Sequence, residues 1–250
     1  MTVADLLAAP AVSKPGRPPV ASEDEPTDPS YRTTARIIGG IYLAGMVIGI
    51  GGNVLVQSIL AAPGGLATIA ASSTLLALGA IAWLATVAGD AVHGVLMFPV
   101  LRRHSERTAV GYLAARIADA LFIAIMALLI VAQIPIGVRF LEAGAADTTY
   151  LQAASAVLSE ANLYAYEFAM ITVGVAGVVL CSAFLRSGLI PRALAIWGLV
   201  GYVVLLCGSV LQILGYELHS IQAAPGGAWE VFIGVWLIVK GFRTSPLSRS

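Results

Sequence analysis

Long runs of apolar residues, separated by short polar or glycine- and proline-containing breaks, form the main pattern of the chain. Six such runs cover residues 37–60, 73–101, 109–136, 163–185, 193–215 and 227–242. A helix of about 20 predominantly apolar residues crosses the hydrocarbon core of a bilayer, which is roughly 30 Å thick. Five runs reach that length, whereas the sixth is shorter and needs a thinner bilayer or an interfacial extension. The pattern therefore predicts an all-α fold, a polytopic bundle of six transmembrane helices.

The breaks between these runs carry residues that favour turns and loops. Proline and glycine occur together after the first run, at residues 62–65, and again before the sixth, at residues 224–227. A polar stretch from Glu142 to Glu160 separates the third and fourth runs, and the segment from Ser187 to Pro191 separates the fourth and fifth. We expect a loop at each of these positions.

The first 34 residues have a different composition from the rest of the chain. They are rich in proline and contain the acidic run Glu23-Asp24-Glu25. Such a segment cannot bury enough apolar surface to offset the entropy lost on ordering, so we expect a disordered tail. The predicted organisation is a tail at residues 1–34, a six-helix transmembrane domain at 35–243 and a short second tail at 244–250.

Basic residues are concentrated in alternate loops. Arg102, Arg103 and Arg107 lie between the second and third runs, and Arg186 and Arg192 lie between the fourth and fifth. The intervening loops hold Arg139 and are otherwise acidic or neutral. By the positive-inside rule both tails are cytoplasmic, which requires an even number of spans and so agrees with six.

Composition supports the membrane class and excludes several functions. Hydrophobic residues make up 58% of the chain and charged residues 11%, and the formal net charge is zero. The mean hydropathy is +0.88. This balance gives no sign of nucleic-acid binding, and both cysteines, Cys181 and Cys207, lie in apolar runs. The chain also lacks a nucleotide-binding loop, a nucleophile elbow and a paired-histidine spacing for haem or zinc, so we expect no metal site and no cofactor.

Ionisable residues lie deep within the second and third runs. Asp90 and His93 are three residues apart, and so are Arg116 and Asp119, so each pair occupies one face of its helix. The short turn between the runs makes the two helices antiparallel neighbours, with both pairs at similar distances from that turn. A charge at the centre of a membrane helix costs about 2.5–3.5 kcal/mol, so such groups face the bundle interior. We expect the two pairs to meet there.

Two further acids, Glu167 and Glu230, also lie within apolar runs, and we expect both nearer the outer side. An ion pair between Arg116 and one carboxylate would explain part of this group of ionisable residues as a structural contact that holds two helices together. The remaining carboxylates must then be protonated, exposed to a water-filled cavity, or matched by a bound cation or cationic ligand. His93 either relays protons with Asp90 or is a buried histidine with satisfied hydrogen bonds.

Other polar side chains suggest that a cavity opens outward from this cluster. The candidates for its lining are Asn53, Gln57, Gln133, Tyr164, Tyr166 and Gln212. The alternative is that these amide and hydroxyl groups simply join neighbouring helices.

Several local patterns resemble one family of bacterial membrane proteins. They are ARIIGGIYL at residues 35–43, Asp90, Arg116, SGLIPRAL at 187–194, and Glu230 followed by WLIVKGF at 236–242. Together they resemble domain-of-unknown-function family 4386 over about residues 35–243. The resemblance implies a six-helix, multi-pass protein of the bacterial cytoplasmic (inner) membrane and implies no activity. It does not include His93, so a role for His93 would be particular to this chain.

Three functional hypotheses fit these features. The favoured one is a proton-linked small-molecule permease or binding protein, and the main alternative is a non-catalytic structural or sensory membrane module. The third is a membrane-embedded enzyme that uses acid catalysis on a lipophilic substrate, although the sequence favours a protein that is not an enzyme. Expected partners are the lipid bilayer and a small-molecule or lipophilic ligand. A homo-oligomer through the small residues Gly45 and Gly49 is left open.

Overall fold

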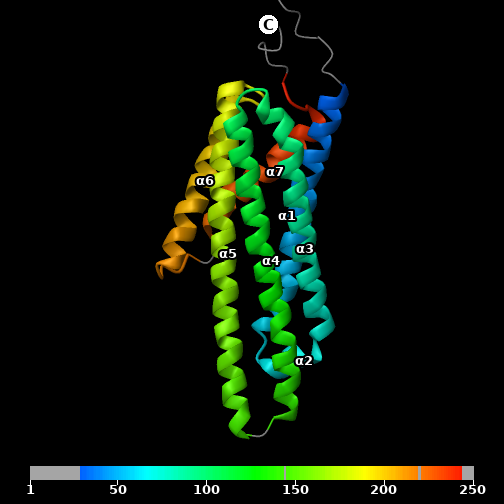
Figure 1. The fold of residues 1–250 in the computed structure, drawn as a ribbon, viewed down its shortest axis with the longest axis vertical. Helices are drawn as coiled ribbons and strands as arrows, with labels where there is room; N and C mark the ends of the chain where they lie inside the picture. Colours follow the sequence, from blue (N-terminus) through cyan, green and yellow to red (C-terminus); the bar gives the residue numbers. More distant parts are fainter. Residues whose placement is uncertain (1–28, 144, 219–220, 244–250) are drawn as a thin grey trace, which may run out of the picture.

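The computed structural model describes residues 29–143, 145–218 and 221–243, and within them the chain is almost entirely helical. The elements are α1 (Pro29–Leu60), α2 (Leu66–Ala71), α3 (Ser73–Arg102), α4 (Glu106–Glu142), α5 (Ala145–Ser187), α6 (Arg192–Ile213), the 3-10 helix η2 (Ile221–Ala223) and α7 (Ala224–Val239), as Figure 1 shows. Six helices are long and apolar enough to cross a membrane. The predicted all-α, six-helix bundle is confirmed for the described part of the chain.

Two helix boundaries differ from the expected ones. Helix α1 begins at Pro29, so residues 29–34 are helical rather than part of a tail. Helix α5 begins at Ala145, so most of the polar stretch from Glu142 to Glu160 is helix rather than loop. Alanine, leucine and glutamine are good helix formers, and this part of α5 also packs on α4. The expected tails at 1–28 and 244–250 lie outside the described residues.

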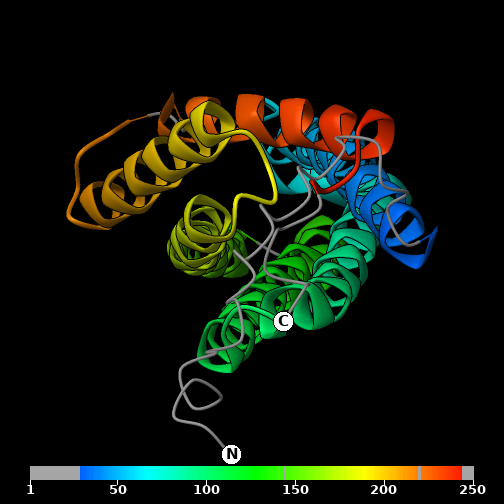
Figure 2. The same cartoon turned by 90° about the horizontal axis from the view of Figure 1, so that it is seen from above.

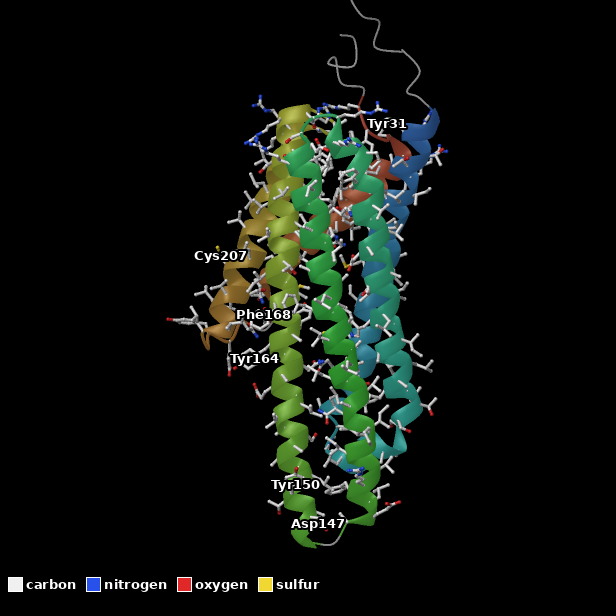
Figure 3. All side chains as sticks on the ribbon, viewed as in Figure 1. Tyr31, Asp147, Tyr150, Tyr164, Phe168 and Cys207 are labelled. Carbon is white, nitrogen blue, oxygen red and sulfur yellow. The ribbon has the colours of Figure 1, made fainter. Side chains whose placement is uncertain are left out.

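The helices differ greatly in length. Helix α5 has 43 residues and α6 has 22, which at 1.5 Å per residue correspond to about 65 Å and 33 Å. The hairpin of α4 and α5 therefore continues well past the end of α6, together with α2 (Figure 1). Asp147 and Tyr150 lie near the far end of α5 (Figure 3).

The six long helices form a closed ring. Each packs against two neighbours in the order α1, α3, α4, α5, α6, α7, and α7 closes back on α1, as the view from above in Figure 2 illustrates. A β-carbon placed on Gly39 of α1 would lie 2.5 Å from the carbonyl oxygen of Gly234 on α7. Glycine is therefore needed for the backbones to approach this closely where the ring closes.

Helix ends are set by local sequence signals. The Ser105 side chain accepts a hydrogen bond of 3.3 Å from the Thr108 amide and so caps the start of α4. Gly188, at φ 68°, makes the turn that ends α5, and Pro191 precedes α6. Both described chain ends lie at the same end of the bundle as these two connections (Figure 1). The assignment of this end to the cytoplasm stays a prediction from the loop charges.

Candidate functional site

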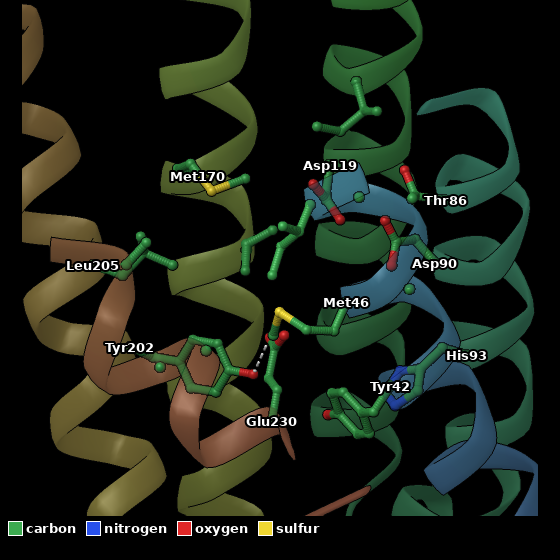
Figure 4. Close-up of a pocket in the computed structure, with 18 of the residues that line it drawn as sticks. Tyr42, Met46, Thr86, Asp90, His93, Asp119, Met170, Tyr202, Leu205 and Glu230 are labelled. Carbon is green, nitrogen blue, oxygen red and sulfur yellow. Dashed lines mark hydrogen bonds between the residues drawn. The ribbon is translucent and has the colours of Figure 1, made fainter. Parts of the chain in front are cut away.

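A cavity of about 600 Å³ lies inside the ring, and all six long helices contribute to its lining. Its charged and polar lining consists of Tyr42 on α1, Thr86, Asp90 and His93 on α3, Arg116 and Asp119 on α4, Tyr166 on α5, Tyr202 on α6 and Glu230 on α7. Figure 4 labels these residues except Arg116 and Tyr166. Most of the remaining lining is apolar. A largely apolar cavity with a few converging polar groups is the usual form of a small-molecule site.

Arg116 links the two helices of the hairpin formed by α3 and α4. Its guanidinium forms an ion pair with Asp90 on α3, and its Nη1 lies 3.2 Å from Oδ2 of Asp119, one turn further along α4. Asp119 is buried, with 1% of its surface exposed. Gly94 permits the approach, because a β-carbon there would lie 3.2 Å from Cβ of Arg116. Of the four ionisable residues that the sequence places deep in this hairpin, the structure thus brings together three in one ion-pair cluster.

His93 occupies the same wall but pairs with a different residue. Its Nδ1 lies 2.7 Å from the Tyr112 hydroxyl on α4, and its ring meets that of Tyr42 edge-on at 4.7 Å. When the hydroxyl donates to Nδ1, the hydrogen of the neutral imidazole lies on Nε2. This Nε2 is buried and without a hydrogen-bond partner. No hydrogen bond joins His93 to Asp90 in the described structure, so a direct relay between them is not formed here.

Glu230 faces the acids of the ion-pair cluster, Asp90 and Asp119, from the opposite side of the cavity (Figure 4). Its Oε1 accepts a hydrogen bond of 2.9 Å from the Tyr202 hydroxyl on α6. No salt bridge reaches Glu230 among the residues described. We expected Glu230 nearer the outer side, and the ring instead places it on the same cavity as Asp90 and Asp119. Spacing along the chain could not predict this, because α7 and α3 are far apart in sequence.

Glu167 does not belong to this site. It is buried on α5, with 1% of its surface exposed, and does not line the cavity. Its carboxylate lies next to Ser209 on α6 without a hydrogen bond of good geometry. Glu167 therefore belongs to the packing between α5 and α6, although the sequence analysis grouped it with the ionisable residues of α3 and α4.

Of the six predicted lining residues, Tyr166 lines the cavity and the other five lie elsewhere. Asn53 and Gln57 are exposed on α1, and Tyr164 lies on an exposed face of α5 (Figure 3). Gln133 forms hydrogen bonds with Ser155 and Ser159 of α5. The side-chain oxygen of Gln212 accepts a hydrogen bond from the Leu218 amide. The spacing of residues along the chain shows which of them share a helix face, but it does not show which face points into the ring. For Gln133, joining helices is the role the structure supports.

Aromatic rings form much of the wall, and sequence reasoning missed two of them. Tyr42 and Tyr202 line the cavity, and both meet the buried Trp229 ring edge-on, at 6.1 Å and 5.4 Å. Trp83 and Tyr166 meet at 6.5 Å on the other side. Both missed residues are tyrosines inside apolar runs of the sequence. A buried tyrosine hydroxyl usually needs a polar partner, so their position could have indicated a polar site.

A ring of six membrane-spanning helices around a cavity with a charged lining defines a multi-pass integral membrane protein. The chain belongs to the family described as Domain of unknown function (DUF4386), whose model matches residues 37–241. No curated protein and no solved structure matches the chain. The resemblance seen in the sequence is confirmed, and the family description supplies no activity.

Proposed function

We propose that this protein is a proton-linked permease or binding protein for a small molecule, and that the central cavity is its binding site. The observation that carries the proposal is the cavity itself, which has a volume of about 600 Å³ and receives side chains from all six long helices. Ligand sites typically have volumes of about 300–1,000 Å³. Ionisable residues that face a cavity inside a membrane protein mark substrate or proton pathways.

The proton linkage rests on the balance of charge in the lining. Asp90, Asp119 and Glu230 are three acids, and Arg116 is the one fixed cation in the described lining. Acids in excess of the fixed cations inside a membrane protein take up protons or bind positive charge, so these groups can exchange protons through the cavity. A change in the protonation of these groups on ligand binding would couple the ligand to the proton gradient.

The proposal includes a location and an orientation. We place the protein in the bacterial cytoplasmic (inner) membrane, with both chain ends in the cytoplasm. The loop arginines cluster at the end of the bundle that also holds the described chain ends, and the positive-inside rule favours the cytoplasm for that end. Ile50 on α1 and Val231 on α7 line the cavity and are also 57% and 40% exposed. They support an entrance between α1 and α7.

A second candidate is a structural or sensory membrane module. The observation that favours it is the pairing of Arg116 with both Asp90 and Asp119, because a closed ion-pair cluster can hold α3 against α4 without any ligand. In that case the excess acid Glu230 would stay protonated and donate a hydrogen bond within the bundle.

Reconstitution distinguishes the two candidates. Purified protein in liposomes that contain a pH-sensitive dye is offered a panel of small amines, amino acids and sugars. A permease should give a ligand-dependent change of internal pH that Glu230→Gln abolishes, because Glu230 is the acid of the described lining without a salt bridge and an amide cannot exchange its proton. Glu160→Gln, at an exposed position on α5, is the matched control and should behave as wild type. If no compound moves protons or solute through folded wild-type protein, the module is favoured instead.

A further inference from the structure

We propose that the ligand of the central cavity is a small organic cation, held by the carboxylate of Glu230 between the aromatic rings of the cavity wall. This inference rests on the proposed function in using the same cavity, and it adds the chemical class of the ligand. It also assigns Glu230, rather than the acids of the hairpin, as the group that meets the ligand's charge.

The first step concerns which acid is free to bind. Asp90 and Asp119 both pair with Arg116, so each already has a cation beside it. Among the described residues, Glu230 accepts a hydrogen bond of 2.9 Å at Oε1 from the Tyr202 hydroxyl and forms no salt bridge. A carboxylate that lines a cavity and lacks a cation is the group whose charge a ligand can neutralise.

The second step concerns the sign of the ligand's charge. The one guanidinium in the described lining is already shared by two carboxylates, so an incoming anion would meet Glu230 without an available cation of its own. A neutral ligand would bring no charge to pair with Glu230, which would then keep its proton. A cationic ligand supplies the missing charge in a region where an unpaired ion is costly.

The third step concerns the walls. Tyr42, Trp83, Tyr166 and Tyr202 line the cavity from four different helices. The negative π faces of such rings attract cations, by about 0.5–2 kcal/mol for each well-placed ring, and aromatic cages are a recurrent way to bind quaternary ammonium groups. Edge-on contacts with Trp229 and between Trp83 and Tyr166 hold the rings in place before a ligand arrives. The site is therefore preorganised.

The fourth step distinguishes an organic cation from a metal ion. Within the described residues, no group of three or more His, Cys, Asp or Glu side chains is placed to hold a metal ion. The cavity is also large for a bare ion, and much of its lining is apolar, as with Met46, Met170 and Leu205. An organic cation fits both the charge and the volume.

Proton exchange at Glu230 follows from the same arrangement. The titratable and charged groups that face Glu230 are Tyr42 on α1, Asp90 and His93 on α3, Tyr112, Arg116 and Asp119 on α4, Tyr166 and Cys181 on α5, and Tyr202 on α6. A proton and an organic cation compete for the one carboxylate. When the cation binds the protonated site, Glu230 loses its proton to water, so binding releases a proton and weakens as the pH falls.

Binding of tetraphenylphosphonium to the full-length protein in a nonionic detergent tests the inference. Tetraphenylborate has the same shape and the opposite charge, and detergent alone gives the background. We expect the phosphonium to bind at least tenfold more tightly than the borate. Glu230→Gln, which keeps the size of the side chain, should weaken phosphonium binding at least tenfold. Glu167→Gln, the same change at a buried glutamate outside the cavity, should not.

Equal binding of the two probes, or a Glu230→Gln variant that binds the phosphonium as wild type does, would overturn the inference. Thermal unfolding of each variant checks that it is folded. If Glu230→Gln does not fold, the wild-type protein decides by two further measurements. Its affinity for the phosphonium should fall between pH 9 and pH 5, and binding should release protons into weakly buffered solution. Affinity that is constant over this range with no proton release would also overturn it.

Failure of this inference can be told apart from failure of the proposed function. Selective phosphonium binding that depends on Glu230, without any ligand-driven pH change in liposomes, removes the permease and keeps the cation site. Ligand-driven pH changes with neutral or anionic compounds, together with equal binding of the two probes, keep the permease and remove the cation site.

Discussion

Arg116 is the residue on which the polar lining of the cavity depends, because it pairs with two acids at once. Its guanidinium pairs with Asp90 on one helix and with Asp119 on its own helix. Arginine presents five N–H donors in a planar fork, so one side chain can serve two carboxylates. Lysine carries a compact charge on a flexible chain and cannot reproduce this geometry.

Replacing Arg116 by methionine should destabilise the protein strongly. The change leaves the buried Asp119 and the partly buried Asp90 without their cation, and removal of one partner of a buried ion pair typically costs about 3–5 kcal/mol. Arg116→Lys should fall between wild type and Arg116→Met. The measurement is the temperature at which the helical circular dichroism signal is lost in detergent.

The control for this prediction is Arg102→Met. Arg102 pairs with Glu106 at 3.5 Å on the surface, where both side chains are more than 60% exposed. Exposed pairs contribute about 0–1 kcal/mol, so this variant should unfold near the wild-type temperature. Similar unfolding temperatures for Arg116→Met and Arg102→Met would show that the buried pair does not hold the hairpin together.

For single residues, the sequence predicts contacts within the α3–α4 hairpin better than contacts across the ring of helices. Asp90, Arg116 and Asp119 could be placed together because a short turn fixes the register of α3 against α4. Glu230 could not be placed with them, because its position depends on how α7 closes the ring. Asn53 and Gln57 have a helical spacing that suggests one face, yet nothing in that spacing says that the face points outward.

The elements that close the ring are α1 and α7, and they meet through glycine. Gly39 and Gly234 face each other so closely that each β-carbon would approach the other residue's carbonyl oxygen, at 2.5 Å and 3.1 Å. Small residues allow such backbone approach, and in lipid this packing contributes much of the drive for helix association. Glu230 lies on α7 four residues before Gly234, so this contact also positions the cavity carboxylate.

Replacing Gly39 by alanine should loosen the ring and weaken ligand binding together. The added methyl group would meet backbone atoms that cannot move without shifting α7, and overpacking of this kind costs about 1–3 kcal/mol. The unfolding temperature and the affinity for tetraphenylphosphonium should both fall. Gly40→Ala is the control, since a β-carbon there meets nothing within 4 Å. An unaltered Gly39→Ala variant would contradict the assigned role of this contact.

Helix identity could be predicted from apolar length, whereas helix ends could not. Five of the six runs are long enough to cross the hydrocarbon core and the sixth nearly so, and their helical state follows from the need to satisfy backbone hydrogen bonds in lipid. The first part of α5 is polar enough to look like a loop, and its helix is stabilised by contacts with α4 such as those from Gln133 to Ser155. Such contacts are not visible in local composition.

At the scale of the whole molecule, an even number of spans puts both described chain ends at one end of the bundle. The turn between α3 and α4 and the link between α5 and α6 lie at that end as well (Figure 1). By the positive-inside rule, the loop arginines predict that this end is cytoplasmic. The opposite end holds the connection between α4 and α5.

Cysteine labelling of intact cells tests this orientation. In a background without Cys181 and Cys207, a membrane-impermeant thiol reagent should label Thr149→Cys near the start of α5. It should label His104→Cys, in the turn before α4, only after the cells are broken. Both positions are exposed, and the His104 change keeps all the arginines that set the orientation. The reverse pattern would invert the topology and place the tails outside.

The unequal lengths of α5 and α6 have a practical consequence for imaging. A helix about 65 Å long exceeds even the roughly 40–45 Å of a complete bilayer, so the far part of the α4–α5 hairpin stands clear of a detergent belt. Small membrane proteins are usually hidden within that belt and offer no landmark for aligning particle images. In this 25.8 kDa chain the hairpin acts as a built-in fiducial that marks one side of every particle.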